Sequence, residues 1–304
     1  MRRSSSELEF EITGFGGMDN IEDAARLKGP VVGNPAGLAE CAQIVNFDVN
    51  DSYSGTTRQG TSKIYTGVPH SLDPNGTGYF VDGSFKLLLP DYTSASLCSL
   101  KSPLNPMSYA PVNYLTVCSN SVDLFMAQAG VITPFSVPTE NFKEAIQPAQ
   151  IVFFFGRRLY YAVGNVLYYS DADNIEQADT RDAPFVFNSP ITMGLPLDNG
   201  IYIGADKVYW LAGRAPEDFV INGIAYDGQV VKGTDVAIEG ALANLSGKWG
   251  MFTAFDGVCL CSDNGQVNNL TLKKISFHNG QQGASLIKQS AGLLGNINQY
   301  ISWV

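Results

Sequence analysis

The chain has 304 residues, a formal net charge of -10 and only 16% charged residues, whereas an average soluble domain has about 25%. It contains 17 Phe, 14 Tyr and 3 Trp, which are too many aromatic residues for a disordered chain. The negative charge also excludes a typical nucleic-acid-binding domain, because such domains hold phosphates with an excess of Lys and Arg. The composition therefore indicates a folded chain with few charges for its surface.

The N-terminal sequence carries no targeting signal. Arg2 and Arg3 are not followed by an apolar segment, so we expect no secretory signal peptide. The most apolar run, 151–155, is far shorter than the roughly 20 residues that a membrane helix needs. The five cysteines are odd in number and irregularly spaced, which favours reduced thiols over disulfides. We therefore expect a chain made in a cytoplasm, with Cys259 and Cys261 buried on one face of a strand.

Taken in chain order, the predicted elements are almost all β-strands. Residues 35–42 form the one short helical candidate near the N-terminus, and a hairpin is possible within 44–64. Five clear hairpins follow, each with two apolar segments around a short turn. They span residues 79–89, 114–126, 159–169, 201–211 and 251–261. Residues 284–294 fit a helix or a strand, and residues 300–304 alternate like a strand that pairs with one from the first 70 residues.

The hairpins recur at intervals of about 35–50 residues, the period at which propeller blades repeat. The intervals leave room for two more strands in each unit. The candidates are residues 185–187 and 191–193 after the third hairpin, and 219–221 and 230–231 after the fourth. A blade packs both faces on its neighbours, which explains strands that are apolar at nearly every position.

We therefore expect an all-β, propeller-like fold with five to six four-stranded blades. A β-sandwich or a pair of small barrels is the alternative, because either would produce similar local signals. The expected organisation is an N-terminal arm at residues 1–30, which orders on a neighbour, and a single all-β domain at residues 31–304.

Short motifs in both halves of the chain resemble a known family. They are Gly16-Gly17-Met18-Asp19, Asn46-Phe47-Asp48-Val49, Arg58-Gln59-Gly60, Leu167-Tyr168-Tyr169-Ser170-Asp171 and Val208-Tyr209-Trp210-Leu211-Ala212-Gly213. With these motifs the chain resembles tailed-bacteriophage virion proteins of the tail nozzle or tail hub (tubular tail) type. The resemblance implies a structural β-propeller subunit in a homo-oligomeric ring, commonly a hexamer, in the tail of the virion. Its partners would be the portal and adaptor above it and tail fibre or spike proteins.

The resemblance also implies that the ring forms part of the conduit for DNA ejection, where DNA passes without specific binding. An acidic lumen suits this role, because a basic wall would hold the polyanion through counterion release. Low charge content fits a subunit whose sides are covered by neighbours, since interface cores are depleted in charged residues. Identical head-to-tail contacts can close such a ring.

The sequence supplies no catalytic, cofactor-binding or metal-binding residue that we would assign, so we expect no enzyme activity. His70 and His278 both lie in turn-rich segments, and no G-x-S-x-G motif is present. The segment that begins at Asp48 resembles a calcium loop, but Tyr53 and Gln59 occupy the places of its Gly and its bidentate Glu.

Carboxylates are densest between residues 170 and 183. This group contains Asp171, Asp173, Glu176, Asp179 and Asp182. A cation site or the acid/base pair of a glycosidase is conceivable there, but all five belong to one connection between strands, so we expect a solvated loop. The alternative function is a carbohydrate-binding or glycosidase-type propeller, in which Trp210 and Trp249 would stack on sugars.

Overall fold

A computed structural model describes the chain in several stretches. These are residues 15–18, 39–41, 47–49, 55–57, 65–239, 246–272, 277, 284–292 and 295–303. They consist of β-strands, with one turn of 3-10 helix at Pro216–Asp218 as the sole helical element among them. The expected all-β class is therefore confirmed. The chain divides into two compact units, Met1–Lys63 with Thr271–Ser276, and Ile64–Leu270 with Phe277–Val304.

The first unit contains two small strand pairs. Strand β1 (Phe15–Met18) pairs in parallel with β2 (Ala39–Cys41), and β3 (Phe47–Val49) pairs antiparallel with β4 (Gly55–Thr57). The hairpin expected within 44–64 is present, but it belongs to this unit. The helical turn expected at 35–42 is wrong for residues 39–41, because pairing with β1 outweighs a weak local helix preference. Of the expected arm at residues 1–30 only β1 is described, so the arm stays a prediction.

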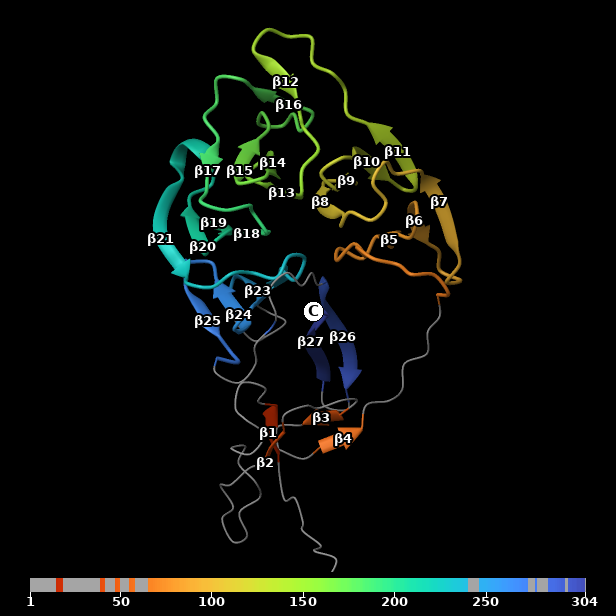
Figure 1. The fold of residues 1–304 in the computed structure, drawn as a ribbon, viewed down its shortest axis with the longest axis vertical. Helices are drawn as coiled ribbons and strands as arrows, with labels where there is room; N and C mark the ends of the chain where they lie inside the picture. Colours follow the sequence, from red (N-terminus) through yellow and green to blue (C-terminus); the bar gives the residue numbers. More distant parts are fainter. Residues whose placement is uncertain are drawn as a thin grey trace, which may run out of the picture. The chain divides into compact units, whose positions relative to one another are not determined.

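Five antiparallel sheets follow one another in the second unit (Figure 1). The first contains β5 (Tyr79–Val81), β6 (Phe85–Leu88) and β7 (Ser94–Cys98), and His70 bridges Val81 beside β5. The second contains β8 (Ser108–Val112), β9 (Leu115–Ser119), β10 (Leu124–Gln128) and β11 (Val131–Pro134). The third contains β13 (Ile151–Phe155), β14 (Arg158–Val163), β15 (Val166–Tyr169) and β17 (Phe185–Val186). The fourth contains β18 (Met193–Leu197), β19 (Gly200–Gly204), β20 (Val208–Ala212) and β21 (Val220–Tyr226). The fifth contains β22 (Val236–Glu239), β23 (Lys248–Ala254), β24 (Gly257–Ser262) and β25 (Val267–Asn269).

All five predicted hairpins are confirmed. They form the strand pairs β5–β6, β9–β10, β14–β15, β19–β20 and β23–β24. The turns contain the residues that such turns require, as at Gly83 and Gly164, whose φ angles are +69° and +61°.

The assignment of the remaining strands needs one correction. Residues 185–187 and 219–221 begin β17 and β21 of the third and fourth sheets, as expected. Residues 191–193 do not complete the third sheet, because Met193 opens β18 of the fourth. Similarly, Val230 bridges Ala254 of the fifth sheet. Each four-stranded sheet therefore consists of a hairpin, a strand that precedes it in the chain and a strand that follows it. The local pattern of residues does not show which sheet a strand between two hairpins joins.

Both faces of the central strands are buried. In β14, Leu159 and Tyr161 belong to the apolar cluster shared with the second sheet, whereas Tyr160 and Ala162 belong to the cluster shared with the fourth. Four such clusters fill the spaces between the five consecutive sheets. Successive first strands β8, β13, β18 and β22 also lie close together. This arrangement is propeller-like and differs from a sandwich, in which each sheet buries one face.

The C-terminal part of the second unit is a hairpin of β26 (Ala284–Gly292) and β27 (Gly295–Trp303). The ambiguous residues 284–294 are thus strand over the part that is described. The expected strand at residues 300–304 is present, but its described partner is β26, with Tyr300 opposite Ile287. Most of the first 70 residues lie outside the described ones, so pairing with a strand among them stays a prediction. Pairing with the preceding strand closes the shortest loop, which costs the least chain entropy.

Candidate interaction site

The carboxylates between residues 170 and 183 are held by local partners. The short strands β12 (Lys143–Ala145) and β16 (Gln177–Asp179) form a ribbon in which Lys143 lies opposite Asp179. The Lys143 Nζ atom lies 2.7 Å from Asp171 and 3.1 Å from Asp179. Hydrogen bonds from the Arg181 side chain, and then from its backbone N–H, hold the pKa of Asp179 well below its usual range. This part of the group is a structural ion-pair cluster.

Other members of the group have partners of their own. Arg157 pairs with Asp173, and the backbone N–H of Ser136 donates to Glu176 over 2.7 Å. Asp182 is exposed. Within the described stretches, no three His, Cys, Asp or Glu residues are placed to hold a metal ion. The expected solvated loop is right for Asp173 and Asp182, which are exposed. It is wrong for Asp179, which lies in β16 with its side chain 10% exposed, because the ion pairs with Lys143 and Arg181 hold this segment in a short ribbon.

The histidine and cysteine candidates that the structure describes are hydrogen-bonded or buried. The two ring nitrogens of His70 lie 2.9 Å from Ser71 Oγ and from the carbonyl oxygen of Pro103. His278 lies outside the described residues. Cys259 and Cys261 are buried in the core between the fourth and fifth sheets, as expected, and burial raises the pKa of both thiols.

The two tryptophans named for sugar stacking are not free platforms. Trp210 is only 4% exposed and packs against Tyr202, with ring centroids 4.5 Å apart. Trp249 is half-buried, and its indole N–H donates to the carbonyl of Ser246 over 2.9 Å. A sugar ring has no open aromatic face at Trp210.

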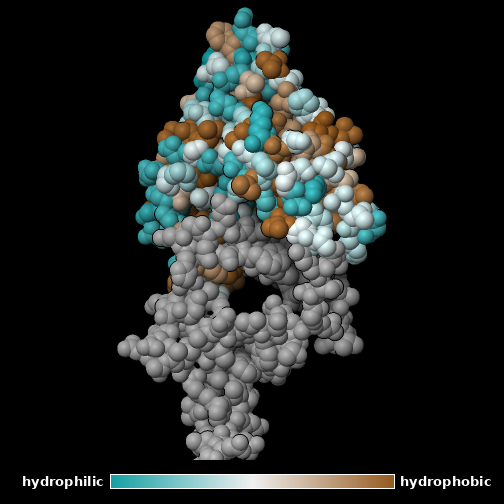
Figure 2. Space-filling view, turned by 45° about the vertical axis from the view of Figure 1, so that its right-hand side comes forward, coloured by the Kyte–Doolittle hydropathy of each residue, from teal (hydrophilic) through white to brown (hydrophobic). Residues whose placement is uncertain are grey.

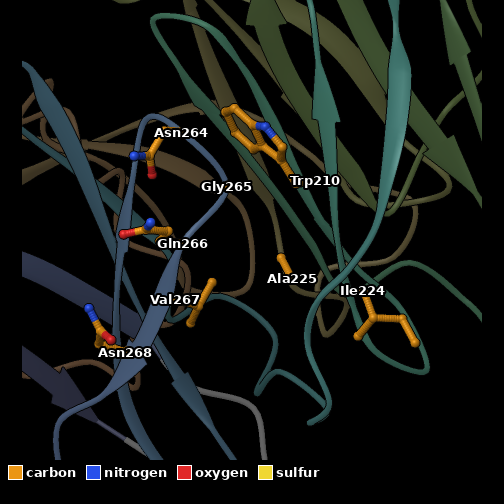
Figure 3. Close-up of a pocket in the computed structure, with 8 residues that line it drawn as sticks. All are labelled: Trp210, Ile224, Ala225, Asn264, Gly265, Gln266, Val267 and Asn268. Carbon is orange, nitrogen blue, oxygen red and sulfur yellow. The ribbon is translucent and has the colours of Figure 1, made fainter.

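A pocket of about 440 Å³ does lie beside Trp210, between the fourth and fifth sheets (Figure 3). Its lining includes Ala225 of β21 on one side and the segment from Asn264 to Asn268 on the other. In Figure 3 the amide side chains of Asn264, Gln266 and Asn268 stand on the β25 side, and Ile224 points away from them. The pocket is thus a polar groove between the outer strands of two neighbouring sheets.

A hydrogen-bond network ties β21 to the fifth sheet at one end of this groove. The Tyr226 hydroxyl donates to Asp256 Oδ2 over 2.6 Å, and Asn269 Nδ2 donates to the Tyr226 oxygen over 2.7 Å. Burial raises the pKa of Tyr226. Sequence reasoning did not single out these three residues, because their partnership joins positions 43 residues apart.

Strand β21 has unusual surface properties for an outer strand. Its seven residues carry no charge, and Val220, Ile221 and Ile224 are 58%, 52% and 51% exposed. We call these three side chains the β21 edge. The described sheets record β20 as the neighbour of β21 on one side and no strand on the other. Figure 2 shows that apolar side chains also reach the surface in separate places elsewhere on the second unit.

The geometry of β21 explains the exposure of its isoleucines. Ile221 lies opposite Leu211 and Ile224 lies opposite Tyr209, and the extra residue between them forms a bulge with Gly223 at φ +80°. Both isoleucines therefore share the face that is directed toward the third sheet. The outer strand of that sheet, β17, is only two residues long. It is too short to cover the seven residues of β21.

The negative charge of the chain is concentrated in residues 65–272, mostly in the connections between the strands of the five sheets. Residues 65–272 contain 20 of the 29 acidic residues and 10 of the 19 basic ones, which gives this stretch a net charge of -10. The rest of the chain has nine of each and is balanced. The β21 edge is an uncharged strip on this acidic part of the molecule.

These features define a β-propeller protein with an exposed outer strand. No protein-family model matches the chain, and no curated protein matches it. Among solved structures, it is similar to the WD40 β-propeller domain of Doa1, with 9% identity, 69% of this chain and 68% of that chain covered, and a TM-score of 0.42. A chain of the mitotic checkpoint complex is 11% identical to this one. The match covers 82% of this chain and 78% of that chain, with a TM-score of 0.46.

A gluconolactonase from Xanthomonas campestris has 11% identity, covers 77% of this chain and 82% of its own, and has a TM-score of 0.38. All of these likenesses are too distant to transfer a residue's role. Separately, no helix in the described part of the chain is long and apolar enough to cross a membrane.

Proposed function

We propose that the chain is a structural subunit of a tailed-phage virion, of the nozzle or hub type, that assembles into a ring around the path of DNA ejection. The observation that carries this proposal is the placement of the charge. The whole net charge of -10 lies in residues 65–272, which form the five sheets. A conduit wall of this sign lets DNA pass without the counterion release that holds it on a basic surface.

The ion-paired carboxylates support a structural role over catalysis. A glycosidase needs two carboxyl groups about 5–10 Å apart, one of them able to donate a proton. Asp171 and Asp179 share one lysine, and the pKa of Asp179 is lowered, which is the wrong direction for an acid. The carbohydrate alternative also lacks an open aromatic platform at Trp210, which is 4% exposed. That alternative and any enzyme activity are therefore the less favoured proposals.

The proposal predicts that the purified chain binds neither DNA nor glycans. Fluorescence anisotropy with a labelled DNA duplex at about 50 mM salt should show no binding, because low salt favours any phosphate contact that exists. A basic DNA-binding protein of similar size serves as the positive control. A glycan array measured on the same preparation should also be negative.

Two results would contradict this prediction in different ways. DNA binding that weakens steeply with added salt would show a phosphate-binding surface and overturn the conduit role. Selective glycan binding that is lost when Gln266 and Asn268 are both replaced by alanine would favour the carbohydrate alternative. Both side chains are exposed, so these replacements should leave the fold intact.

A further inference from the structure

The strongest unassigned feature of the structure is the β21 edge, because it differs from the other outer strands. Strand β17 has two residues, β25 has three, and β11 has four and ends in Pro134. Strand β7 of the first sheet is also free of charge and proline, but it has only five residues. Short length and proline protect sheet edges from pairing with other chains. Strand β21 has seven residues, no proline and no charge. A bulge at Gly223 distorts it locally, but its length leaves more backbone open to pairing than any of the other outer strands has.

Exposed apolar side chains accompany this unprotected backbone. A strand added beside β21 would bring side chains to both of its faces. Val220 lies opposite Ala212, whereas Ile221 and Ile224 lie opposite Leu211 and Tyr209, so the three exposed side chains are divided between the two faces. Ile221 and Ile224 are exposed on one face and Val220 on the other, and apolar side chains exposed together along one strand favour an interaction site.

The charges favour one class of partner. The segment 219–226 is uncharged and lies across the pocket from residues 264–268, which are also uncharged. Asp218 and Asp227 flank the first segment, and Asp227 pairs with Lys207 over 2.8 Å. A basic partner would find no carboxylate within either segment. A second copy of the chain, whose residues 65–272 also carry a net charge of -10, meets the least repulsion where the surface is free of like charges.

We propose that the β21 edge is the surface through which one copy of the chain contacts the next. This inference rests on the proposed function, because a ring brings a second copy to each subunit. Identical contacts between unlike surfaces close a ring, and the β21 edge supplies one of the two surfaces. The outer N–H and C=O groups of β21 then pair with the neighbouring copy, and Val220, Ile221 and Ile224 become buried.

The test compares three forms of the full chain by analytical ultracentrifugation over a range of concentrations. Wild type should associate. Ile224→Lys places a charge in the contact and should weaken association at least tenfold. Val131→Lys is the matched control, because Val131 is 65% exposed on the outer strand β11, and it should associate like wild type. Ile224 is 51% exposed, so lysine fits without unfolding, and a thermal melt checks this.

Hydrogen exchange measured on wild type gives a second readout that needs no substitution. Amides of β21 should become more protected as the concentration rises, and those of β11 should not. Association that survives Ile224→Lys would overturn the inference while leaving the ring itself in place. A wild-type chain that stays monomeric would overturn it as well. If that monomeric chain shows protected β21 amides only when it is part of whole virus particles, the β21 edge contacts a different protein.

Discussion

Two neighbouring tyrosines show how much a single hydroxyl group matters in this fold. Tyr160 and Tyr161 in β14 are 0% and 1% exposed, and neither hydroxyl has a hydrogen-bond partner among the described residues. Tyr202 in β19 is equally buried, but its hydroxyl donates to the carbonyl oxygen of Ser262 over 2.6 Å. A buried polar group without a partner lowers the free energy of unfolding, whereas a buried hydrogen bond raises it. The three tyrosines therefore serve the same packing role with opposite contributions from their hydroxyls.

Replacement by phenylalanine should separate these contributions. Tyr161→Phe removes an unpaired hydroxyl and should leave the free energy of unfolding unchanged or raise it by about 1 kcal/mol. Tyr202→Phe removes a hydrogen bond and leaves the Ser262 carbonyl with one partner fewer, so it should lower the free energy by about 1 kcal/mol. Urea unfolding of both variants and wild type measures the difference. Equal effects of the two substitutions would show that these hydroxyls are in equivalent surroundings.

At the scale of elements, the close approach of neighbouring sheets depends on glycine. A Cβ atom added at Gly194 in β18 would lie 2.3 Å from the ring of Phe153 in β13. The Phe153 ring cannot easily move aside, because it is 4% exposed and stacks on the Tyr160 ring with an angle of 1° between the ring planes. The third and fourth sheets therefore pack at a distance that only glycine allows here.

Gly194→Ala should destabilise the fold by about 1–3 kcal/mol, since extra volume in a packed core forces side chains off their preferred rotamers. The double variant Gly194→Ala, Phe153→Leu should recover part of this loss relative to Phe153→Leu alone, because the smaller side chain makes room for the methyl group. A double-mutant cycle in urea gives the coupling energy. Additive effects would mean that the two residues do not limit the approach of the sheets.

The strands were predictable from the sequence, and their partners were only partly so. Apolar segments on both sides of short turns such as Asp82-Gly83 identify all five hairpins, because the two strands are adjacent in the chain. The strand opened by Met193 was assigned to the wrong sheet, since a strand's pattern does not specify which neighbour it pairs with. Likewise, the exposure of Ile224 depends on a bulge and on the shortness of β17, which are properties of the assembled sheets.

At the scale of the whole molecule, the charge is uneven in a way that total composition conceals. Residues 65–272 carry the entire net charge of -10, and residues 219–226 within them are neutral. In the ring that we propose, acidic surface would keep DNA from binding to the wall, and the neutral edge would give copies a place to meet. The low charge content of the chain would then fit both an acidic wall and an uncharged contact.

The central claim, a ring-forming subunit of a phage tail, is tested most directly by electron cryo-microscopy of purified particles of the phage that encodes the chain. The account predicts a closed ring of copies in the tail, with acidic side chains toward the lumen and each β21 covered by the neighbouring copy. Particles that lack the chain, or that hold it as single copies away from the DNA path, would contradict the claim.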